Sequence, residues 1–469
     1  MSLRDVTFKV EDGSLGNSED MGTGVHVKIG AAPITATAPV LITNTMKPSQ
    51  IKEKLGLSPL ADACLDSIEN GSGKIYCVPV TPTADGTNGE VKHTGSGTGT
   101  VSVSGKPNNS YDIMIRITGS GTLNAATFAC SANGGYSYEN EETIPLNGEK
   151  EIAGTGIQVT FEGEFVENDI YQFSSTAPTI SNEAVLKAVE GLYHSDLEFE
   201  FIHIVGVSGR ALWAALAVCA RQFLSLYKRP VLFLCEARYI TKEESLDEYA
   251  AALKAEAKGI DSYYVQVCGA WSQYTRWDGR EQLINNAGIV AGLYGIASVQ
   301  QSIGQVDTFS ISEAKMTRLM PEGIEDHISD LDDAKYLTFR KYYGLTGCYV
   351  NNAKVLCRDG SDYRYAEHVR VLNKMIREIY KKSVTMLQMD ISASDDMETD
   401  INNILEALNT PIEDMADANE ISSGSVTIAD LESVNILQDE ELRLKLTFVP
   451  RGYVREFIFD MSMENPYRN

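Results

Sequence analysis

A regular alternation of strand-like and helix-like segments between residues 199 and 268 constrains the fold of this chain more than any other feature. The expected strands are short apolar runs without polar alternation, and long helical stretches separate them. Strands of this kind form parallel or mixed sheets that helices cover on both faces. The segments are strand Phe199–Val205, helix Ser208–Phe223, strand Val231–Cys235, helix Thr241–Lys258 and strand Tyr263–Cys268. The sequence therefore predicts a mixed α/β body.

Capping residues support the helices of this body. A helix is expected to begin after Ser58, with Pro59 at its first position, because serine and proline are favoured at these two places. Thr241 and Glu244 have the spacing of a capping box, and Gly259 is expected to end that helix.

Composition changes abruptly over Thr94–Thr176, which holds 12 of the 38 glycines together with runs of period-two alternation. Such a pattern is typical of antiparallel strands joined by turns. The segments on either side, strand Ile75–Val80 and helix Glu183–Glu190, belong to the α/β body. We therefore expect an inserted antiparallel β-domain.

Each end of the chain carries isolated strand patterns. The first dozen residues alternate, with Val6, Phe8 and Val10 on one side. Near the other end a first strand turns Leu442, Leu444 and Leu446 to one face. A second, long and aromatic strand is expected over Tyr453–Met463 and includes Phe457 and Phe459. Isolated strands are marginal in water, so these segments require another sheet, which another molecule can supply.

Charge excludes a general nucleic-acid-binding surface, because 65 acidic residues oppose 40 basic ones and give a net charge of −25. Two neighbouring segments have opposite charge: a basic helix over Tyr363–Met386 precedes Asp390–Glu420, which holds ten acids and no base. The N-terminus lacks the pattern of a secretory signal and no apolar run is long enough to span a membrane, so we expect a soluble protein. The eight cysteines form no CxxC pair and are expected to be free and buried.

Signatures of chemistry are absent. Gly206-Val207-Ser208-Gly209 lacks the third glycine of a dinucleotide site, and we expect Ser208 to cap a helix. No HExxH or Cys/His cluster has metal-ligand spacing, and His203 is expected to be a core histidine. The loop Trp271–Arg280 gathers two tryptophans and two arginines and is interpreted as a packed loop or subunit contact, with a ligand site as the alternative.

The order of these parts resembles the sheath proteins of contractile phage tails and of phage-tail-like bacteriocins. The resemblance spans essentially the whole chain: the N-terminal arm ending in Gly13-Ser14-Leu15-Gly16, the α/β body, the insertion with ATFACSANGGYSYE, and the terminal LRLKLTFVPRGYVREFIFDMSMENP. It implies a non-enzymatic structural subunit without cofactor, catalytic residue or metal site. Such a subunit forms stacked hexameric rings around an inner tail tube, and contraction of the rings drives the tube through a bacterial envelope.

The resemblance also implies a role for each part of the chain. The domains are expected at 1–24 (strand arm and linker), 25–93 with 177–335 (α/β sheath body), 94–176 (outward-facing β-domain) and 336–469 (C-terminal sheath domain with its arm). The inter-subunit arm residues are expected to be Val6, Phe8, Val10, Leu442, Leu444, Leu446, Tyr453, Phe457 and Phe459. Both the basic helix and the acidic segment qualify as the tube-facing element, and we favour the acidic residues Asp395, Asp396, Glu398, Asp400 and Glu406.

The expected partners are other copies of the chain, the inner tube protein, and baseplate and tail terminator proteins, with neither nucleic acid nor membrane anchoring. The expected location is a phage tail or phage-tail-like particle assembled in the bacterial cytoplasm. Two alternatives stay open at this point: an α/β enzyme with an accessory β-domain, and a baseplate or adhesin component of the same kind of particle.

Overall fold

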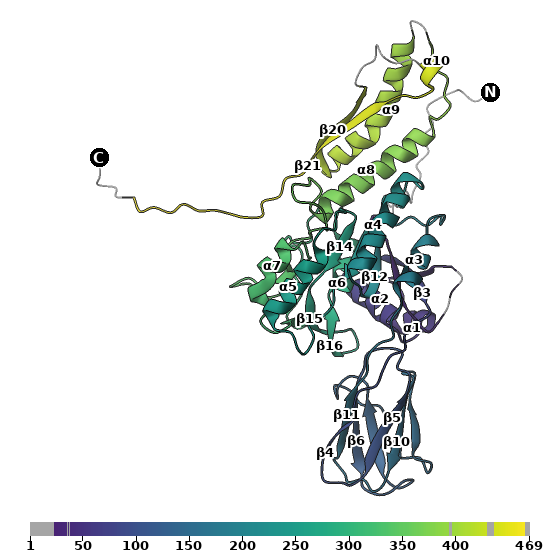
Figure 1. The fold of residues 1–469 in the computed structure, drawn as a ribbon, viewed down its shortest axis with the longest axis vertical. Helices are drawn as coiled ribbons and strands as arrows, with labels where there is room; N and C mark the ends of the chain where they lie inside the picture. Colours follow the sequence, from purple (N-terminus) through teal and green to yellow (C-terminus); the bar gives the residue numbers. More distant parts are fainter. Residues whose placement is uncertain (1–22, 35, 37, 394–395, 429–435, 465–469) are drawn as a thin grey trace, which may run out of the picture. The chain divides into compact units, whose positions relative to one another are not determined.

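The computed structural model describes residues 23–464 except 35, 37, 394–395 and 429–435. The chain divides into two compact units, Met1–Lys374 and Met375–Asn469 (Figure 1). The N-terminal arm residues Val6, Phe8 and Val10 lie outside the described residues. No helix of the described part is long and apolar enough to span a membrane.

A six-stranded mixed sheet forms the centre of the first unit, as the sequence predicts. Its strand order is β14-β13-β12-β1-β3-β2, and every neighbouring pair is parallel except β2 with β3. The strands are β1 (His26–Ala31), β2 (Val40–Thr43), β3 (Lys74–Val80), β12 (Phe201–Val207), β13 (Leu232–Glu236) and β14 (Val265–Cys268).

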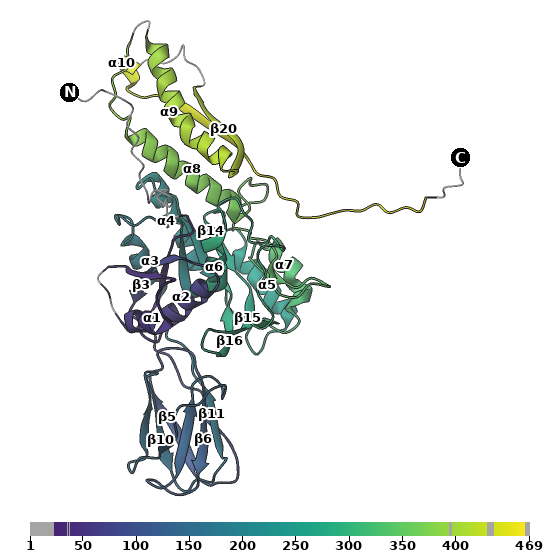
Figure 2. The same cartoon turned by 180° about the vertical axis from the view of Figure 1, so that it is seen from behind.

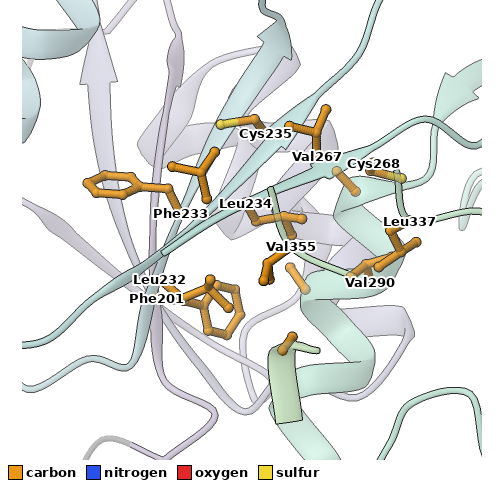
Figure 3. Packing of buried hydrophobic residues seen from close by; sticks show 14 of the residues in the cluster. Phe201, Leu232, Phe233, Leu234, Cys235, Val267, Cys268, Val290, Leu337 and Val355 are labelled. Carbon is orange, nitrogen blue, oxygen red and sulfur yellow. The ribbon is translucent and has the colours of Figure 1, made fainter. Parts of the chain in front are cut away.

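Helices cover both faces of this sheet. Phe201 and Leu232 are paired in register, and Phe201 packs edge-on against Tyr294 of helix α6. Their strand neighbours Ile202 and Phe233 point to the opposite face, where Phe233 contacts Phe223 of α4. The buried side chains around these contacts form one continuous core (Figure 3). The helices are α1 (Pro48–Leu55), α2 (Pro59–Glu69), α3 (Asn182–Glu190), α4 (Arg210–Ser225), α5 (Leu246–Ala257) and α6 (Ala287–Ile296).

Local capping signals are confirmed at one helix and displaced at another. The Ser58 side chain accepts a hydrogen bond from Ala61 N at the start of α2, as predicted. Helix α5 begins later than expected, because Ser245 and Glu248 form its capping box. Glu244 accepts from Thr241 N at 2.9 Å, as the predicted capping box requires, and also pairs with Arg238 at 2.6 Å, but the helix does not begin there. Ser208 does not cap α4, whose N-cap is Gly209.

The predicted inserted β-domain is present and has its own hydrophobic core (Figure 2). Two antiparallel sheets, ordered β5-β10-β9 and β4-β11-β6-β7-β8, enclose that core. The chain enters and leaves side by side, because Thr83 N and Ala84 N both donate to Thr179 O. The strands are β4 (Lys92–Thr94), β5 (Thr100–Gly105), β6 (Asp112–Gly119), β7 (Thr127–Ser131), β8 (Glu142–Thr143), β9 (Glu149–Ile152), β10 (Ile157–Glu162) and β11 (Ile170–Ser174).

The rest of the first unit completes the main core. A three-stranded sheet is ordered β16-β15-β17, and residues such as Leu337 and Val355 pack into the core of the α/β body. The boundary expected at residue 336 therefore falls inside this unit. The elements are β15 (Trp271–Thr275), β16 (Glu281–Asn285), β17 (Met316–Met320), η1 (Ile324–His327), α7 (Ile328–Asp333), β18 (Phe339–Arg340) and β19 (Tyr349–Val350).

A buried ion pair joins distant parts of this unit. Arg370, in helix α8 (Ala366–Val384), is 1% exposed and donates from Nε to Glu200 Oε1 at 2.5 Å and from an Nη atom to Glu200 Oε2 at 3.1 Å. It also donates to the carbonyls of Tyr294, Ala297 and Ser298, where α6 ends. Glu200 Oε2 accepts from Gly24 N at 2.8 Å. The pair therefore ties the segment before β1 to α6 and α8.

We expect Arg370→Met to lower the free energy of unfolding of the first unit by about 3–5 kcal/mol, because Glu200 would stay buried without its cation. Urea unfolding followed by tryptophan fluorescence measures this change. Arg443→Met is the matched control, since Arg443 pairs with Glu441 on the surface and should cost about 0–1 kcal/mol. Equal effects of the two substitutions would contradict the stabilising role that we assign to the buried pair of Glu200 and Arg370.

We expect a fragment of residues 83–179 to fold alone, because the insertion has its own core and its two ends are hydrogen-bonded together. A cooperative thermal transition with a β-type circular dichroism spectrum checks this prediction. Conversely, a full chain lacking Thr94–Thr176 should keep the α/β body folded. A fragment that shows no cooperative transition would mean that the α/β body is needed to hold the insertion together.

Candidate assembly interface

The second unit holds a small sheet covered by one helix. Strands β20 (Ile421–Ile428) and β21 (Leu444–Pro450) pair antiparallel, and α9 (Met397–Asp417) packs against β20. The buried residues of α9 recur at helical spacing and face one way. They are Ile401, Leu408, Ile412 and Met415. A short helix, α10 (Ile436–Asp439), lies between the two strands in the sequence.

Strand β21 shows the alternation that the sequence predicts. Leu444, Leu446 and Phe448 are half-buried, whereas Lys445 and Thr447 between them are exposed. Leu442, the first residue of the predicted strand, lies before β21 and is half-buried. The apolar face of the strand therefore looks toward the core of the unit.

The predicted second strand over Tyr453–Met463 does not form. Residues 451–464 belong to no helix or strand and run away from the sheet as an extended tail (Figure 1). Phe457 is 75% exposed and Phe459 is 77% exposed, while Tyr453 is half-buried. The reason is physical: within the described part of the chain, this backbone pairs with no other strand, and a lone strand is not stable in water.

The two edges of the small sheet differ. Among the described residues β20 and β21 pair only with each other, so each has an outer edge. At the outer edge of β20, the Asn409 side chain accepts from Val426 N at 2.7 Å and donates to Val426 O at 3.2 Å. An amide in this position imitates a neighbouring strand and protects the edge. Along β21, the side-chain contacts to the backbone come from the paired strand, where Ser422 donates to Pro450 O and Thr427 to Lys445 O.

The proposed tube-facing acids occupy the first half of α9 and the turn before it. Asp396, Glu398 and Glu406 are exposed, and Asp400 is half-buried and accepts from Ser392 N at 2.9 Å. Asp395 lies outside the described residues. In the basic helix, which is the alternative, Arg370 is unavailable because Glu200 holds it.

The predicted loop Trp271–Arg280 is only partly a loop: Trp271–Thr275 form strand β15, and residues 276–280 make the packed turn that joins β15 to β16. Arg276 and Arg280 of this turn both pair with the buried Asp62 carboxylate of α2. Burial alone would raise the pKa of Asp62, but the two guanidinium groups outweigh it and lower this pKa to about 2. Arg276 also pairs with Asp66 at 3.1 Å.

A cavity of about 510 Å³ lies beside this loop, where β12 and β13 end. Ligands of α/β sheets commonly bind at such places. Here the charged residues of the lining already have partners: Arg276 holds both Asp62 and Asp66, Glu236 accepts from His203, and Asp112 accepts from Ser174. This arrangement explains the crowded sequence of the loop without a ligand.

His203 is a satisfied core histidine, as predicted. Lys28 Nζ lies 2.6 Å from its Nδ1 and Glu236 Oε1 lies 3.0 Å from its Nε2. Burial and the charge of Lys28 hold the pKa of His203 well below its usual value. The neutral ring therefore accepts from Lys28, which has only donors, and donates to Glu236. In the described part of the chain, no group of three or more His, Cys, Asp or Glu side chains could hold a metal ion.

Two family models together match most of the chain. The N-terminal domain of DUF2586 matches residues 3–354, and the C-terminal domain of DUF2586 matches residues 362–468. The chain belongs to the DUF2586 family. A search of curated proteins found no match to this DUF2586 chain.

Solved structures share its fold over their whole length. A chain of the contracted sheath complex of PVC, an extracellular contractile injection system, is 11% identical, with 100% of this chain and 99% of that chain covered and a TM-score of 0.57. A chain of the contracted baseplate of the anti-feeding prophage is 14% identical, with 100% of both chains covered and a TM-score of 0.53. The search also found the sheath tail protein of Desulfitobacterium hafniense, at 14% identity, 96% and 100% coverage and a TM-score of 0.49. The DUF2586 chain thus has the fold of a contractile sheath protein, which confirms the predicted resemblance.

Two features of the interface escaped the sequence analysis. Strand β20 was not predicted, because its polar run of serines around Gly424 lacks a clear apolar alternation. Asn409 was missed because an asparagine within a helix normally faces solvent. Its amide also donates to Leu405 O at 2.8 Å, one turn earlier in the same helix, and nothing in the local sequence distinguishes it from a solvent-facing asparagine.

We expect Asn409→Ala to increase self-association of the protein, because the Val426 backbone groups at the outer edge of β20 would become free to pair with another strand. Sedimentation velocity over a range of protein concentrations measures this effect. Loss of the two hydrogen bonds to Val426, and of the one to Leu405 O, should also lower the free energy of unfolding by about 1–3 kcal/mol.

Thr410→Ala is the matched control, since Thr410 is the exposed neighbour of Asn409 and bonds only to Glu406 O within the same helix. An Asn409→Ala protein with the sedimentation behaviour of this control would show that the side chain does not protect the edge.

Proposed function

We propose that this protein is the structural subunit of a contractile tail sheath and that its copies are joined by strand addition. The observation that carries the proposal is an exposed tail that joins no sheet among the described residues, in a unit whose small sheet pairs with no further described strand, within a fold that matches a contracted sheath chain from end to end. A structural subunit needs no catalytic residue or cofactor.

Backbone pairing explains why the tail is exposed in a single chain. Residues 453–463 alternate, so that Phe457 and Phe459 point to one side and Glu456 and Asp460 to the other. Their rings stack with centroids 6.2 Å apart. Added to the β21 edge of another copy, the tail would gain main-chain hydrogen bonds and cover its aromatic face, which are the two sources of affinity in strand addition.

Each subunit would both donate and receive strands. The tail and the N-terminal segment around Val6, Phe8 and Val10 are the donors, and the small sheet is the receiver with Leu444 and Leu446 on its inner face. A contact that leads from one copy to the next without closing builds a helical array. Stacked rings linked in this way can change their packing together, which is the two-state change that contraction requires.

The remaining partners follow from the same proposal. The tube protein would meet an exposed face of the second unit, for which we favour the acids Asp396, Glu398 and Glu406 of α9. Baseplate and terminator proteins would hold the two ends of the sheath. The particle would be a phage tail or a phage-tail-like injection particle assembled in a bacterial cytoplasm, with the inserted β-domain facing outward. A baseplate role is the second candidate, because one matching chain comes from a baseplate complex.

We expect a protein lacking residues 451–469 to stay folded and soluble but to form no tubes. Electron microscopy and sedimentation under conditions in which the full chain polymerises test this prediction. Tubes formed by the truncated protein would exclude the tail as a linker. Removal of residues 1–16 should have the same effect.

Paired substitutions in the tail sharpen the test. Phe457→Ser with Phe459→Ser removes the apolar face and should abolish tubes. The matched pair Glu456→Gln with Asp460→Asn alters the opposite face and should leave tubes intact. Equal loss in both variants would mean that the tail does not bind as an alternating strand.

A further inference from the structure

Two cysteines of the first unit lie in contact beneath helix α2. Cys64 of α2 and Cys77 of β3 have their Sγ atoms 3.3 Å apart, and neither side chain is exposed. All eight cysteines of the protein are free and buried, as the sequence predicts. All eight cysteines lie in the described part of the chain. Among them, Cys64 and Cys77 are the pair whose sulfur atoms are in contact.

The surrounding structure holds the two sulfur atoms toward each other. Helix α2 packs directly on β3, and both cysteines belong to one apolar cluster with Ile75 and Leu60. A disulfide requires its sulfur atoms to approach to about 2.05 Å. Closing the remaining gap needs rotation of the two side chains and no exchange of neighbours, because the thiols already face one another.

A buried cation lies beside the pair. Lys28 is paired in register with Cys77 on the adjacent strand β1, and it is fully buried. Burial raises the pKa of the Cys77 thiol, and the positive charge of Lys28 opposes this rise. The pKa of Cys77 still lies well above its usual value, so the thiol is the resting form, and Lys28 offsets only part of the cost of forming the thiolate that reacts with oxidants.

We propose that Cys64 and Cys77 are an oxidation site that forms an intramolecular disulfide when the protein meets a peroxide. One thiolate attacks the peroxide, the O–O bond breaks, and the sulfur becomes a sulfenic acid as hydroxide leaves. The second thiolate then attacks that sulfur, the S–O bond breaks, and the S–S bond forms as a second hydroxide leaves; the two protons released by the two thiols convert both hydroxides to water. Two thiols are oxidised and one peroxide is reduced to two waters.

The cross-link would fasten α2 to β3 in the centre of the first unit. In the reducing cytoplasm the thiols stay free, and the bond forms once the protein reaches an oxidising medium. A bond there closes the short chain segment between α2 and β3 and constrains the unfolded chain. This inference goes beyond the sheath function, and its measurement does not depend on assembly.

Alkylation of the full-length protein tests the proposal. The protein is exposed to hydrogen peroxide, quenched, unfolded, and treated with N-ethylmaleimide before its mass is measured. We expect two fewer alkylated cysteines than in the untreated protein, with restoration by dithiothreitol. Peptide mapping should find Cys64 linked to Cys77. Retention of all eight alkylation sites, or a link between any other two cysteines, would overturn the proposal.

Two variants separate the pair from general thiol oxidation. Cys77→Ala removes one partner and should abolish the paired loss of alkylation sites. Cys235→Ala is the matched control, because Cys235 is equally buried in a strand of the same sheet and touches no other cysteine. It should still lose two sites after peroxide. A paired loss in Cys77→Ala would also overturn the proposal, and the peptide map of the unaltered protein gives the answer even if a variant fails to fold.

Discussion

The buried pair of Glu200 and Arg370 is the interaction on which the first unit depends. Its two charges lie in the core, and every donor of the guanidinium that is recorded meets either the Glu200 carboxylate or a carbonyl at the end of α6. Because Glu200 also holds Gly24, the pair fixes the point where the N-terminal segment enters the sheet. Helix α8 begins in this unit and continues into the second, so the ion pair fixes the start of the helix that connects the two units in the sequence.

Local patterns were sufficient to predict the architecture. Helix caps such as Ser58, the apolar strands of the body and the glycine-rich alternation of the insertion act over a few residues, and the structure follows them. Interactions between distant residues were not predictable in this way. In the sequence, Arg370 resembles the solvent-facing residues of a basic helix. Its partner Glu200 lies 170 residues away, so the residues next to Arg370 in the sequence do not indicate the ion pair. The same limitation hid Asn409, whose partner Val426 belongs to a strand that the sequence did not reveal.

The second unit shows why the prediction of a strand over Tyr453–Met463 was wrong. The pattern over Tyr453–Met463 is that of a strand, yet this segment joins no sheet among the described residues. The pattern encodes a preference for pairing but does not supply the partner. An exposed apolar strand normally promotes aggregation, and the net charge of −25 together with the Asn409 contact opposes random association. Specific assembly therefore depends on whether the outer edge of β20 or that of β21 is free to pair with a strand of another copy.

The hydrogen bonds from Thr83 and Ala84 to Thr179 give the insertion a further property. The α/β body meets this β-domain through two chain crossings that lie side by side and through a few hydrogen bonds close to them, such as Asn109 to Asp62 at 2.7 Å and Gln282 to Ser110 O at 3.0 Å. Most of the enclosed domain can therefore change as long as its ends stay neighbours. The junction is thus a natural exchange point for genetic recombination. A foreign domain with adjacent termini could be grafted there and displayed in as many copies as the assembly has subunits.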